Sequence, residues 1–200
     1  MSPVIDFPAH QRAAADTTLV LLDMQQEHLR MRPAPEVEAA VQNCLMALRH
    51  ARSQRFQVAF TRWTGPGAFF RPFVVQRDWI DGFTPNRADL VFERDRPSCY
   101  SSPWFEDAIT QRSSRFVLAG FSGEIACLAT VIDAFHRHHL VTFLVDASAS
   151  RQLDSVRAFD VHRVVERVAN LFGKVDTTSD WIARTSQSAI KEGKNVEGQF

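Results

Sequence analysis

The 200-residue chain lacks the features that would direct it to a membrane or a nucleic acid. Its 23 basic and 23 acidic residues cancel, so no net field attracts a polyanion. No apolar run reaches the roughly 18 residues of a membrane span. Residues 1–12, MSPVIDFPAHQR, lack the basic and apolar regions of a signal peptide. We therefore expect a cytoplasmic protein that binds neither nucleic acid nor membrane.

Cysteine is scarce as well. The three cysteines, Cys44, Cys99 and Cys127, are odd in number and far apart, which argues against a disulfide framework and a zinc site. Cys44 falls on the apolar face of an expected helix and is interpreted as a core residue. Three histidines stand near the end of another expected helix: His136, His138 and His139. Positive charge suits that helix end, so we expect no metal there and no other cofactor.

What the chain does contain is an alternation of strand-like and helix-like segments. Its length and 45% hydrophobic content fit one domain over residues 1–200, with an irregular lead-in at 1–16 and a polar tail at 187–200. The expected strands are residues 17–23, 56–62, 89–94, 116–120, 140–146 and a short one near Val175. The expected helices are residues 35–54, 102–111, 124–138, 155–171 and one from Ser179. This order predicts an α/β fold, a mostly parallel sheet with helices on both faces.

One stretch, from Arg115 to Ala134, combines a strand, a tight turn and a helix. It reads RFVLAGFSGEIACLATVIDA, in which residues 120–123 interrupt an apolar run and apolar residues then recur at helical spacing. A helix that begins directly after a strand points its unpaired N–H groups beyond the carboxyl edge of that strand, where an anion or a thiolate is stabilised. We expect the chemistry of the protein at this turn.

The same stretch resembles the isochorismatase-like hydrolases, whose motif reads A-G-V-x-T-D-x-C-V-x-x-T-x-x-D-A. The resemblance covers most of residues 17–180 and implies a three-layer, Rossmann-like fold with sheet order 3-2-1-4-5-6. The family's nucleophilic cysteine falls on Ala126, and Cys127 follows it. This is similar to the arrangement of true isochorismatases, which cleave a vinyl ether without a covalent intermediate. The Asp-x-His metal motif of nicotinamidases has no counterpart in FTRWT at residues 60–64.

Two further motifs carry the resemblance. LLDMQ at residues 21–25 looks like the family's strand-one Asp motif, and FERDRPSCYSS at residues 92–102 looks like its K-x-x-x-S-A-F motif. Ser98 and Tyr100 match the serine and the phenylalanine, whereas Arg94 replaces the lysine. No lysine precedes Lys174 to take its place.

The exchange of lysine for Arg94 changes the expected proton chemistry. Arginine keeps the positive charge and favours an ionised Asp23, but it does not give up a proton at ordinary pH. An ionised Asp23 suits a base better than the proton donor that the isochorismatase route implies. The carboxyl ends of parallel strands share one edge, so we expect Asp23, Arg94 and the Ala126–Cys127 pair to converge.

The expected site residues form two groups. The candidate catalytic residues are Asp23, Arg94 and Cys127. The candidate substrate-binding residues are Gln25, Ser98, Tyr100, Ser122, Gly123 and Ala126. A shift of one residue turns a helical side chain by about 100°, so Cys127 is expected to be buried and not to occupy the place of the nucleophile. Glu124, at the family's Asp position, is expected to stabilise the helix start.

The leading interpretation is a hydrolase of a small, anionic molecule that uses no cysteine nucleophile. Asp23 handles the proton, Arg94 positions Asp23 or a substrate carboxylate, and backbone N–H groups of residues 122–126 bind negative charge. Two alternatives remain. A non-catalytic member would bind a metabolite or a partner protein. A cysteine amidohydrolase would act through Cys127, provided that the turn exposes this thiol and lowers its pKa.

Residues 63–88 interrupt the simple alternation. This segment holds six aromatic residues among glycines and prolines: Trp63, Phe69, Phe70, Phe73, Trp79 and Phe83. We expect a lid, an interface or an Ω-like loop packed on its own domain. The aromatic content also favours a homo-oligomer, either a dimer or a tetramer.

Overall fold

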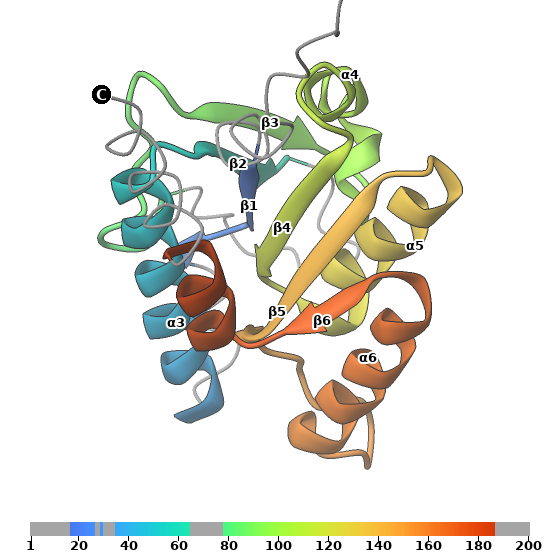
Figure 1. Cartoon of the computed structure of the whole chain (residues 1–200). Helices are drawn as coiled ribbons and strands as arrows, with labels where there is room; N and C mark the ends of the chain where they lie inside the picture. The colour runs from blue at the N-terminus through green and yellow to red at the C-terminus, as the bar shows by residue number, and fades with distance from the viewer. Residues whose placement is uncertain (1–16, 27–28, 30–34, 65–77, 187–200) are drawn as a thin grey trace, which may run out of the picture.

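Six parallel strands form one sheet in the order β3-β2-β1-β4-β5-β6. The computed structural model, shown in Figure 1, describes residues 17–26, 29, 35–64 and 78–186. The strands are β1 (Thr18–Leu22), β2 (Gln57–Trp63), β3 (Leu90–Arg94), β4 (Arg115–Gly120), β5 (Leu140–Ser148) and β6 (Lys174–Asp176). The predicted sheet order is confirmed. In the described part of the chain, no helix has both the length and the hydrophobicity needed to cross a bilayer.

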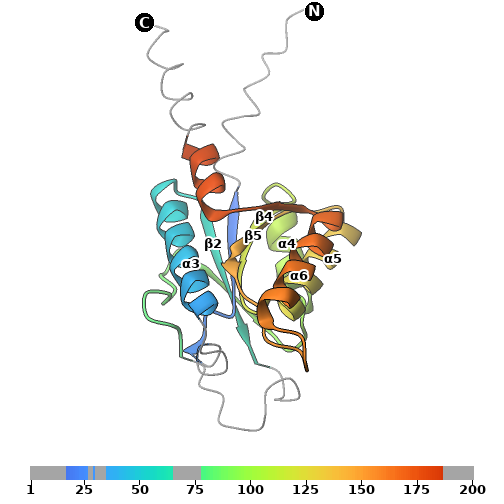
Figure 2. The ribbon, with the colours of Figure 1, turned by 90° about the horizontal axis from the view of Figure 1, so that it is seen from below.

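Helices cover both faces of the sheet, which gives three layers (Figure 2). On one face lies α3 (Pro35–Ser53) with the helix of residues 178–186 beside it. The ring of Trp181 in that helix lies 5.1 Å from the His50 ring of α3, centroid to centroid. The other face carries α4 (Phe105–Thr110), α5 (Leu128–His136) and α6 (Ala158–Phe172).

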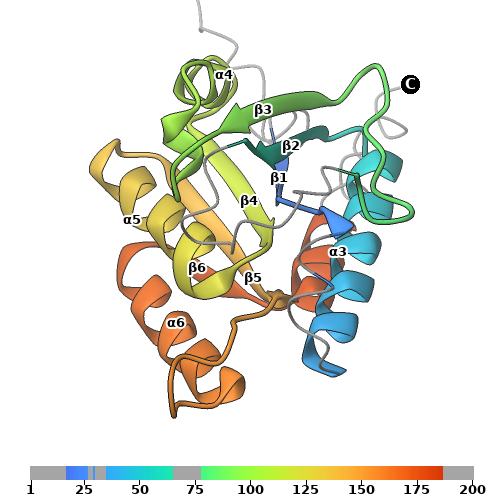
Figure 3. The ribbon, with the colours of Figure 1, turned by 180° about the vertical axis from the view of Figure 1, so that it is seen from behind.

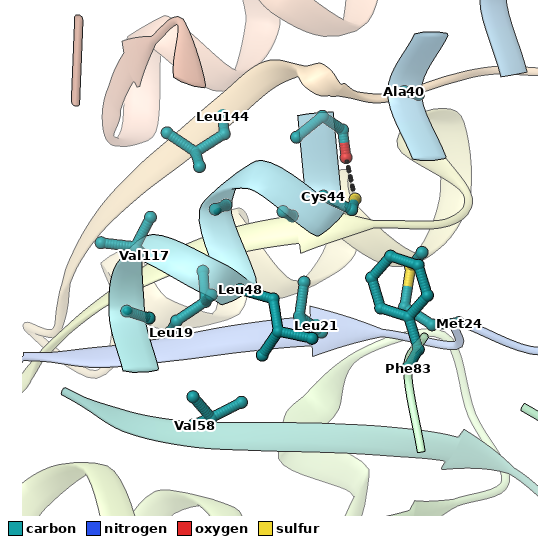
Figure 4. Packing of buried hydrophobic residues seen from close by; sticks show 14 of the residues in the cluster. Leu19, Leu21, Met24, Ala40, Cys44, Leu48, Val58, Phe83, Val117 and Leu144 are labelled. Atoms are coloured by element: carbon teal, nitrogen blue, oxygen red, sulfur yellow. Dashed lines mark hydrogen bonds between the residues drawn. The ribbon is translucent and has the colours of Figure 1, made fainter. Parts of the chain in front are cut away.

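Burial on both faces explains why β1 is the centre of the sheet. Its sequence, TLVLL, is buried throughout. Leu19 and Leu21 pack on the α3 side and Val20 and Leu22 on the other, because successive strand residues point to opposite faces. Figure 4 shows the α3 side of this core, formed by Leu19, Leu21, Cys44, Leu48, Val58 and Val117 among others. Each fully buried leucine contributes about 1.5–3 kcal/mol, so packing on two faces stabilises the strand.

Two helices begin differently from the prediction. The helix expected from residue 102 starts at Phe105, because Cys99–Ser101 form a separate 3-10 helix, η1, whose N-cap is Ser98. The helix expected from residue 124 starts with the π-helical turn η2 (Gly123–Cys127) before α5. The carbonyl oxygen of Ser122 accepts from both Ala126 N and Cys127 N, at 2.9 and 3.0 Å, and so accommodates an extra residue in the first turn.

The described part of the aromatic segment packs on its own domain. Figure 3 shows residues 78–88 running past α3 before β3. Phe83 is fully buried in the α3 side of the core, and the Trp79 ring lies 5.4 Å from that of Phe60. This agrees with the Ω-like interpretation for these residues. The remainder of the expected lid or interface, residues 65–77, lies outside the described residues, as do the lead-in and the tail.

Candidate functional site

Asp23 lies immediately after β1, at the carboxyl edge of the sheet. Its φ of 45° is a left-handed conformation that Asp and Asn adopt more readily than other side-chain-bearing residues. The residue is only 1% exposed. The Thr61 hydroxyl donates to Asp23 Oδ1 at 2.9 Å, and Arg94 Nη2 donates to Oδ2 in a buried ion pair. Strands β2 and β3 thus each supply one partner to a buried carboxylate.

Arg94 is itself held in place by several contacts. Its Nη1 donates to the carbonyl oxygens of Arg96, at 2.5 Å, and Pro97, at 2.9 Å. Its guanidinium carbon lies 5.0 Å from the centroid of the Trp63 ring, a cation–π arrangement. These contacts occupy both Nη1 hydrogens and direct Nη2 to Asp23. Of the two roles expected for Arg94, the geometry supports positioning of Asp23 rather than capture of a substrate carboxylate.

The turn after β4 packs against the end of β1. Gly120 has φ +108°, and a Cβ atom at this position would lie 2.2 Å from the backbone oxygen of Leu22. That oxygen also accepts from Phe121 N at 2.9 Å. The peptide bond between Phe121 and Ser122 is cis. Because Leu22 directly precedes Asp23, this close approach places the turn beside the backbone at the end of β1.

The Cys127 thiol contacts the last residues of β4 and β5. It is fully buried, donates to Gly120 O at 3.5 Å and lies 3.6 Å from Ser148 Oγ. Burial raises the pKa of the Cys127 thiol well above its usual value, although the contact with Ser148 lowers it in part. The predicted burial of Cys127 is confirmed. Its place among the candidate catalytic residues is not supported, because the π-helical turn directs the side chain between β4 and β5.

Ala126 stands where the resemblance places the nucleophile, and its methyl group offers no reactive atom. Among the N–H groups of residues 122–126, Gly123 N donates to Ala149 O at 3.0 Å and Ala126 N to Ser122 O at 2.9 Å. In the described part of the chain, the N–H groups of Ser122 and Ile125 have no acceptor. Of the expected anion-binding N–H groups, those of Gly123 and Ala126 are therefore already bonded within the fold. Those of Ser122 and Ile125 are the ones we consider for anion binding.

Three of the expected substrate-binding residues form hydrogen bonds within the fold. Gln25 is buried, and its Oε1 accepts from Trp63 N at 3.0 Å, which joins the ends of β1 and β2. The Ser98 hydroxyl accepts from Tyr100 N at 3.2 Å. The Tyr100 hydroxyl lies 2.8 Å from Nδ1 of His139, just before the amino end of β5. Motif position alone had placed these side chains in the site.

Other residues of the site were not predicted. Thr61 and Trp63 lie on one face of β2 and contact Asp23 and Arg94 respectively. A polar threonine in the buried run VAFT of β2 was the available signal. The buried carboxylate of Glu124 pairs with the partly exposed Arg151, at 3.2 Å, in addition to its expected place at the helix start. Arg151 follows β5. Sequence spacing did not indicate that a residue after β5 contacts this turn.

A groove of about 820 Å³ lies at the opposite edge of the sheet. Residues at the amino ends of three strands line it, including Arg115, Leu140 and Lys174, together with Trp181. None of the residues around Asp23 lines this groove. Across the described ranges, no group of three or more His, Cys, Asp or Glu side chains is placed to hold a metal ion.

Comparisons with known proteins agree with this fold. The chain resembles the structure of an isochorismatase from Pseudomonas putida KT2440, with 24% identity, a TM-score of 0.74 and coverage of 84% of this chain and 90% of that one. It also resembles a cysteine hydrolase from Pseudomonas syringae pv. phaseolicola 1448A, with 20% identity, a TM-score of 0.74 and coverage of 88% and 94%. A third is an isochorismatase family protein from Burkholderia thailandensis, with 15% identity, a TM-score of 0.71 and coverage of 86% and 96%.

These structural likenesses establish the fold. A comparison with curated protein sequences finds no match. A family model described as the isochorismatase domain matches residues 17–180, which is most of the chain. The chain therefore belongs to the isochorismatase family.

Proposed function

We propose that this protein hydrolyses a small, anionic molecule without forming a covalent bond to it. The observation that carries the proposal is the buried Asp23 carboxylate, held by Thr61 and Arg94 beside a turn whose nucleophile position is Ala126. The family supplies the expectation of a hydrolase, and the side chains present supply the route. Asp23 is the group able to take up a proton, and Ala126 carries no atom that could form a covalent bond to the substrate.

In the proposed reaction, Asp23 acts as a base toward water. The water oxygen forms a bond to the electrophilic carbon while its proton passes to Asp23, and the leaving group departs with that proton. Arg94 keeps its own proton and stabilises the carboxylate. General base catalysis of this kind contributes about 10²–10⁴ in rate. The Ser122 and Ile125 N–H groups stabilise the developing negative charge, to which one such donor contributes about 2.7–4 kcal/mol.

The experiment that tests this proposal is the substitution Asp23→Asn, which keeps the shape of the side chain and removes its basicity. Wild type and variant are assayed on isochorismate, a vinyl ether, and on small anionic esters and amides. We expect Asp23→Asn to abolish turnover while circular dichroism shows a retained fold. The matched control is Asp107→Asn on α4, whose side chain is exposed and should leave turnover unchanged. Activity retained in Asp23→Asn would contradict the proposal.

The non-catalytic interpretation makes a different prediction for the wild-type protein. Saturable binding of isochorismate without turnover of any compound in the panel would favour a binding protein. The cysteine amidohydrolase interpretation is opposed by the burial of Cys127 and the raised pKa of its thiol. The homo-oligomer stays a prediction, and a monomer on sizing chromatography at micromolar concentration would contradict it.

A further inference from the structure

The turn at Gly123 packs against residues that follow β5. Gly123 N donates to Ala149 O at 3.0 Å. A Cβ atom on Gly123 would lie 2.9 Å from Ser150 Oγ and 3.0 Å from His162 Nδ1. These distances are shorter than almost all real Cβ contacts, so a side chain at position 123 would require Ser150 or His162 to shift. Ser150 and His162 therefore touch the backbone whose N–H groups are assigned to the substrate.

The direction of the hydrogen bonds between these groups is fixed by chemistry. His162 Nε2 lies 2.8 Å from the carbonyl oxygen of Val145, which only accepts, so Nε2 carries the hydrogen. In the neutral ring Nδ1 is then an acceptor, and the Ser150 hydroxyl donates to it at 3.0 Å. The chain Ser150–His162–Val145 thus joins the segment after β5, helix α6 and strand β5.

The distance of 3.0 Å between Ser150 Oγ and His162 Nδ1 is also typical of a serine nucleophile and its histidine base. We assign the pair to positioning because Ser150 Oγ lies directly against Gly123, so its neighbour is the backbone of the turn itself. A second contact serves the same turn, because the carboxylate of Glu124 pairs with Arg151 at 3.2 Å. Three consecutive residues after β5, Ala149–Arg151, therefore all hold the turn at Gly123–Glu124.

We propose that Ser150 and His162 are positioning residues for the anion-binding turn. Through Gly123 they set the direction of the Ser122 and Ile125 N–H groups, and this inference rests on the function proposed above. Donors that face a developing charge act only within narrow limits of distance, and a misplacement of about 1 Å costs about 100-fold in rate. The pair thus contributes to catalysis through the backbone, without touching the substrate.

Two isosteric substitutions at one position separate this role from simple anchoring of α6. His162→Asn places an amide oxygen near the Nδ1 position, so an acceptor for Ser150 is kept and the contact with Val145 is lost. His162→Gln places its amide near the Nε2 position, so the contact with Val145 is kept and the acceptor for Ser150 is lost. A third variant, Ser150→Ala, removes the donor itself.

The first readout is amide hydrogen exchange, which needs no substrate. We expect exchange at Gly123 to be at least about tenfold faster in Ser150→Ala and His162→Gln, and within about threefold of wild type in His162→Asn. The amides of β1 should be unchanged in all three and serve as the control for global stability. Wild-type exchange at Gly123 in both Ser150→Ala and His162→Gln would overturn the proposal. So would faster exchange in His162→Asn than in His162→Gln, which is the order that anchoring through Val145 predicts.

The second readout is turnover of the small anionic ester or amide that the wild type hydrolyses fastest. Ser150→Ala and His162→Gln should lower kcat by about 10-fold or more with KM within about threefold, because the turn acts on developing charge. The control Ser53→Ala, an exposed serine on α3, should leave both constants unchanged. An unchanged kcat in both site variants would overturn the proposal. If wild type itself hydrolyses no compound in the panel, the proposed function fails, while exchange at Gly123 still decides whether the pair positions the turn. If Ser150→Ala does not fold, the order of the two His162 variants decides.

Discussion

The ends of β1 and β4 lie side by side in the sheet but contain opposite kinds of chemistry. Beyond β1, Asp23 is a buried charge whose partners come from β2 and β3. Beyond β4, the turn offers backbone N–H groups, a small Ala126 and a thiol directed elsewhere. In our proposal the proton acceptor and the anion-binding groups therefore lie at the ends of two different strands, and neither is a covalent nucleophile. The predictions below test each strand end in turn.

The largest expected effect comes from breaking the charge pair beyond β1. Arg94→Met leaves the Asp23 carboxylate buried with Thr61 but without its cation. We expect the free energy of unfolding to fall by about 3–5 kcal/mol, because an uncompensated buried charge is costly. Urea denaturation measures this loss.

The control for the charge pair is a surface arginine. Arg157, just before α6, pairs with Asp160 at 2.8 Å, and the two side chains are 77% and 40% exposed. Arg157→Met should lower the free energy of unfolding much less than Arg94→Met, because an exposed ion pair contributes little. A loss of similar size in both variants would show that the end of β1 is not organised around Asp23.

A glycine comparison tests the close approach beyond β4. Gly120→Ala combines a positive φ with a Cβ placed 2.2 Å from Leu22 O, and we expect a loss of about 3 kcal/mol. Gly82 also has a positive φ, but its Cβ would meet only the flexible side chain of Leu45, at 3.4 Å. Gly82→Ala should therefore cost about 1 kcal/mol. Equal losses in thermal unfolding would contradict the packing of the turn on β1.

A third prediction concerns the stability of the fold in acid. We assign it to His50 and His139, which lie away from the ends of β1 and β4. Burial lowers the pKa of His50 and of His139, so folding favours their neutral forms. The stabilisation they provide is complete above the unfolded pKa of about 6.5 and is lost as the pH falls through the folded values. The melting temperature should therefore fall between about pH 7 and pH 5.

The histidine responsible can be identified by substitution. His139 lies between the hydroxyl groups of Tyr100, at 2.8 Å, and Thr110, at 3.1 Å, and Glu106 and Arg137 also act on its charge. His139→Gln lacks the titrating group, so its melting temperature should depend less on pH than that of wild type. An unchanged pH dependence in His139→Gln would assign the effect to other groups.

The smallest expected effect is on the thiol beyond β4. Burial raises the pKa of Cys127, so at neutral pH the native protein should react with iodoacetamide very slowly at this residue. Burial also raises the pKa values of Cys44 and Cys99, the latter to about 12. Unfolding in urea removes this burial, so all three cysteines should then react. Rapid alkylation of native Cys127, detected by peptide mass spectrometry, would contradict this prediction and favour the cysteine amidohydrolase interpretation.

Much of the fold could be predicted from the sequence because the central strands are continuous apolar runs. TLVLL is buried on both faces, and such a run is recognisable without knowing its neighbours. The start of α5 could not be placed as well, since the extra residue of η2 depends on a carbonyl that accepts two N–H groups. No local propensity signals such a turn.

Residues of the candidate site could be proposed from the sequence at strand ends, whereas contacts that cross between strands could not. Asp23 and Arg94 could be proposed because Asp23 directly follows β1 and Arg94 is the last residue of β3. Thr61 could not, because its contact with Asp23 depends on the pairing of Leu21 with Phe60. Tyr100 was assigned to the site by motif, but its direction is set by η1 and by His139. A sequence thus indicates which residue types end each strand. It does not indicate the register in which neighbouring strands pair, on which the contacts between strands depend.

The most direct test of the central claim is the turnover of Asp23→Asn and Cys127→Ala, measured beside wild type on the best substrate of the panel. Chemistry at Asp23 without a covalent intermediate predicts that Asp23→Asn loses turnover by at least about 100-fold and Cys127→Ala stays within about threefold. The reverse pattern, with Cys127→Ala inactive and Asp23→Asn active, would contradict the account and assign the reaction to the thiol.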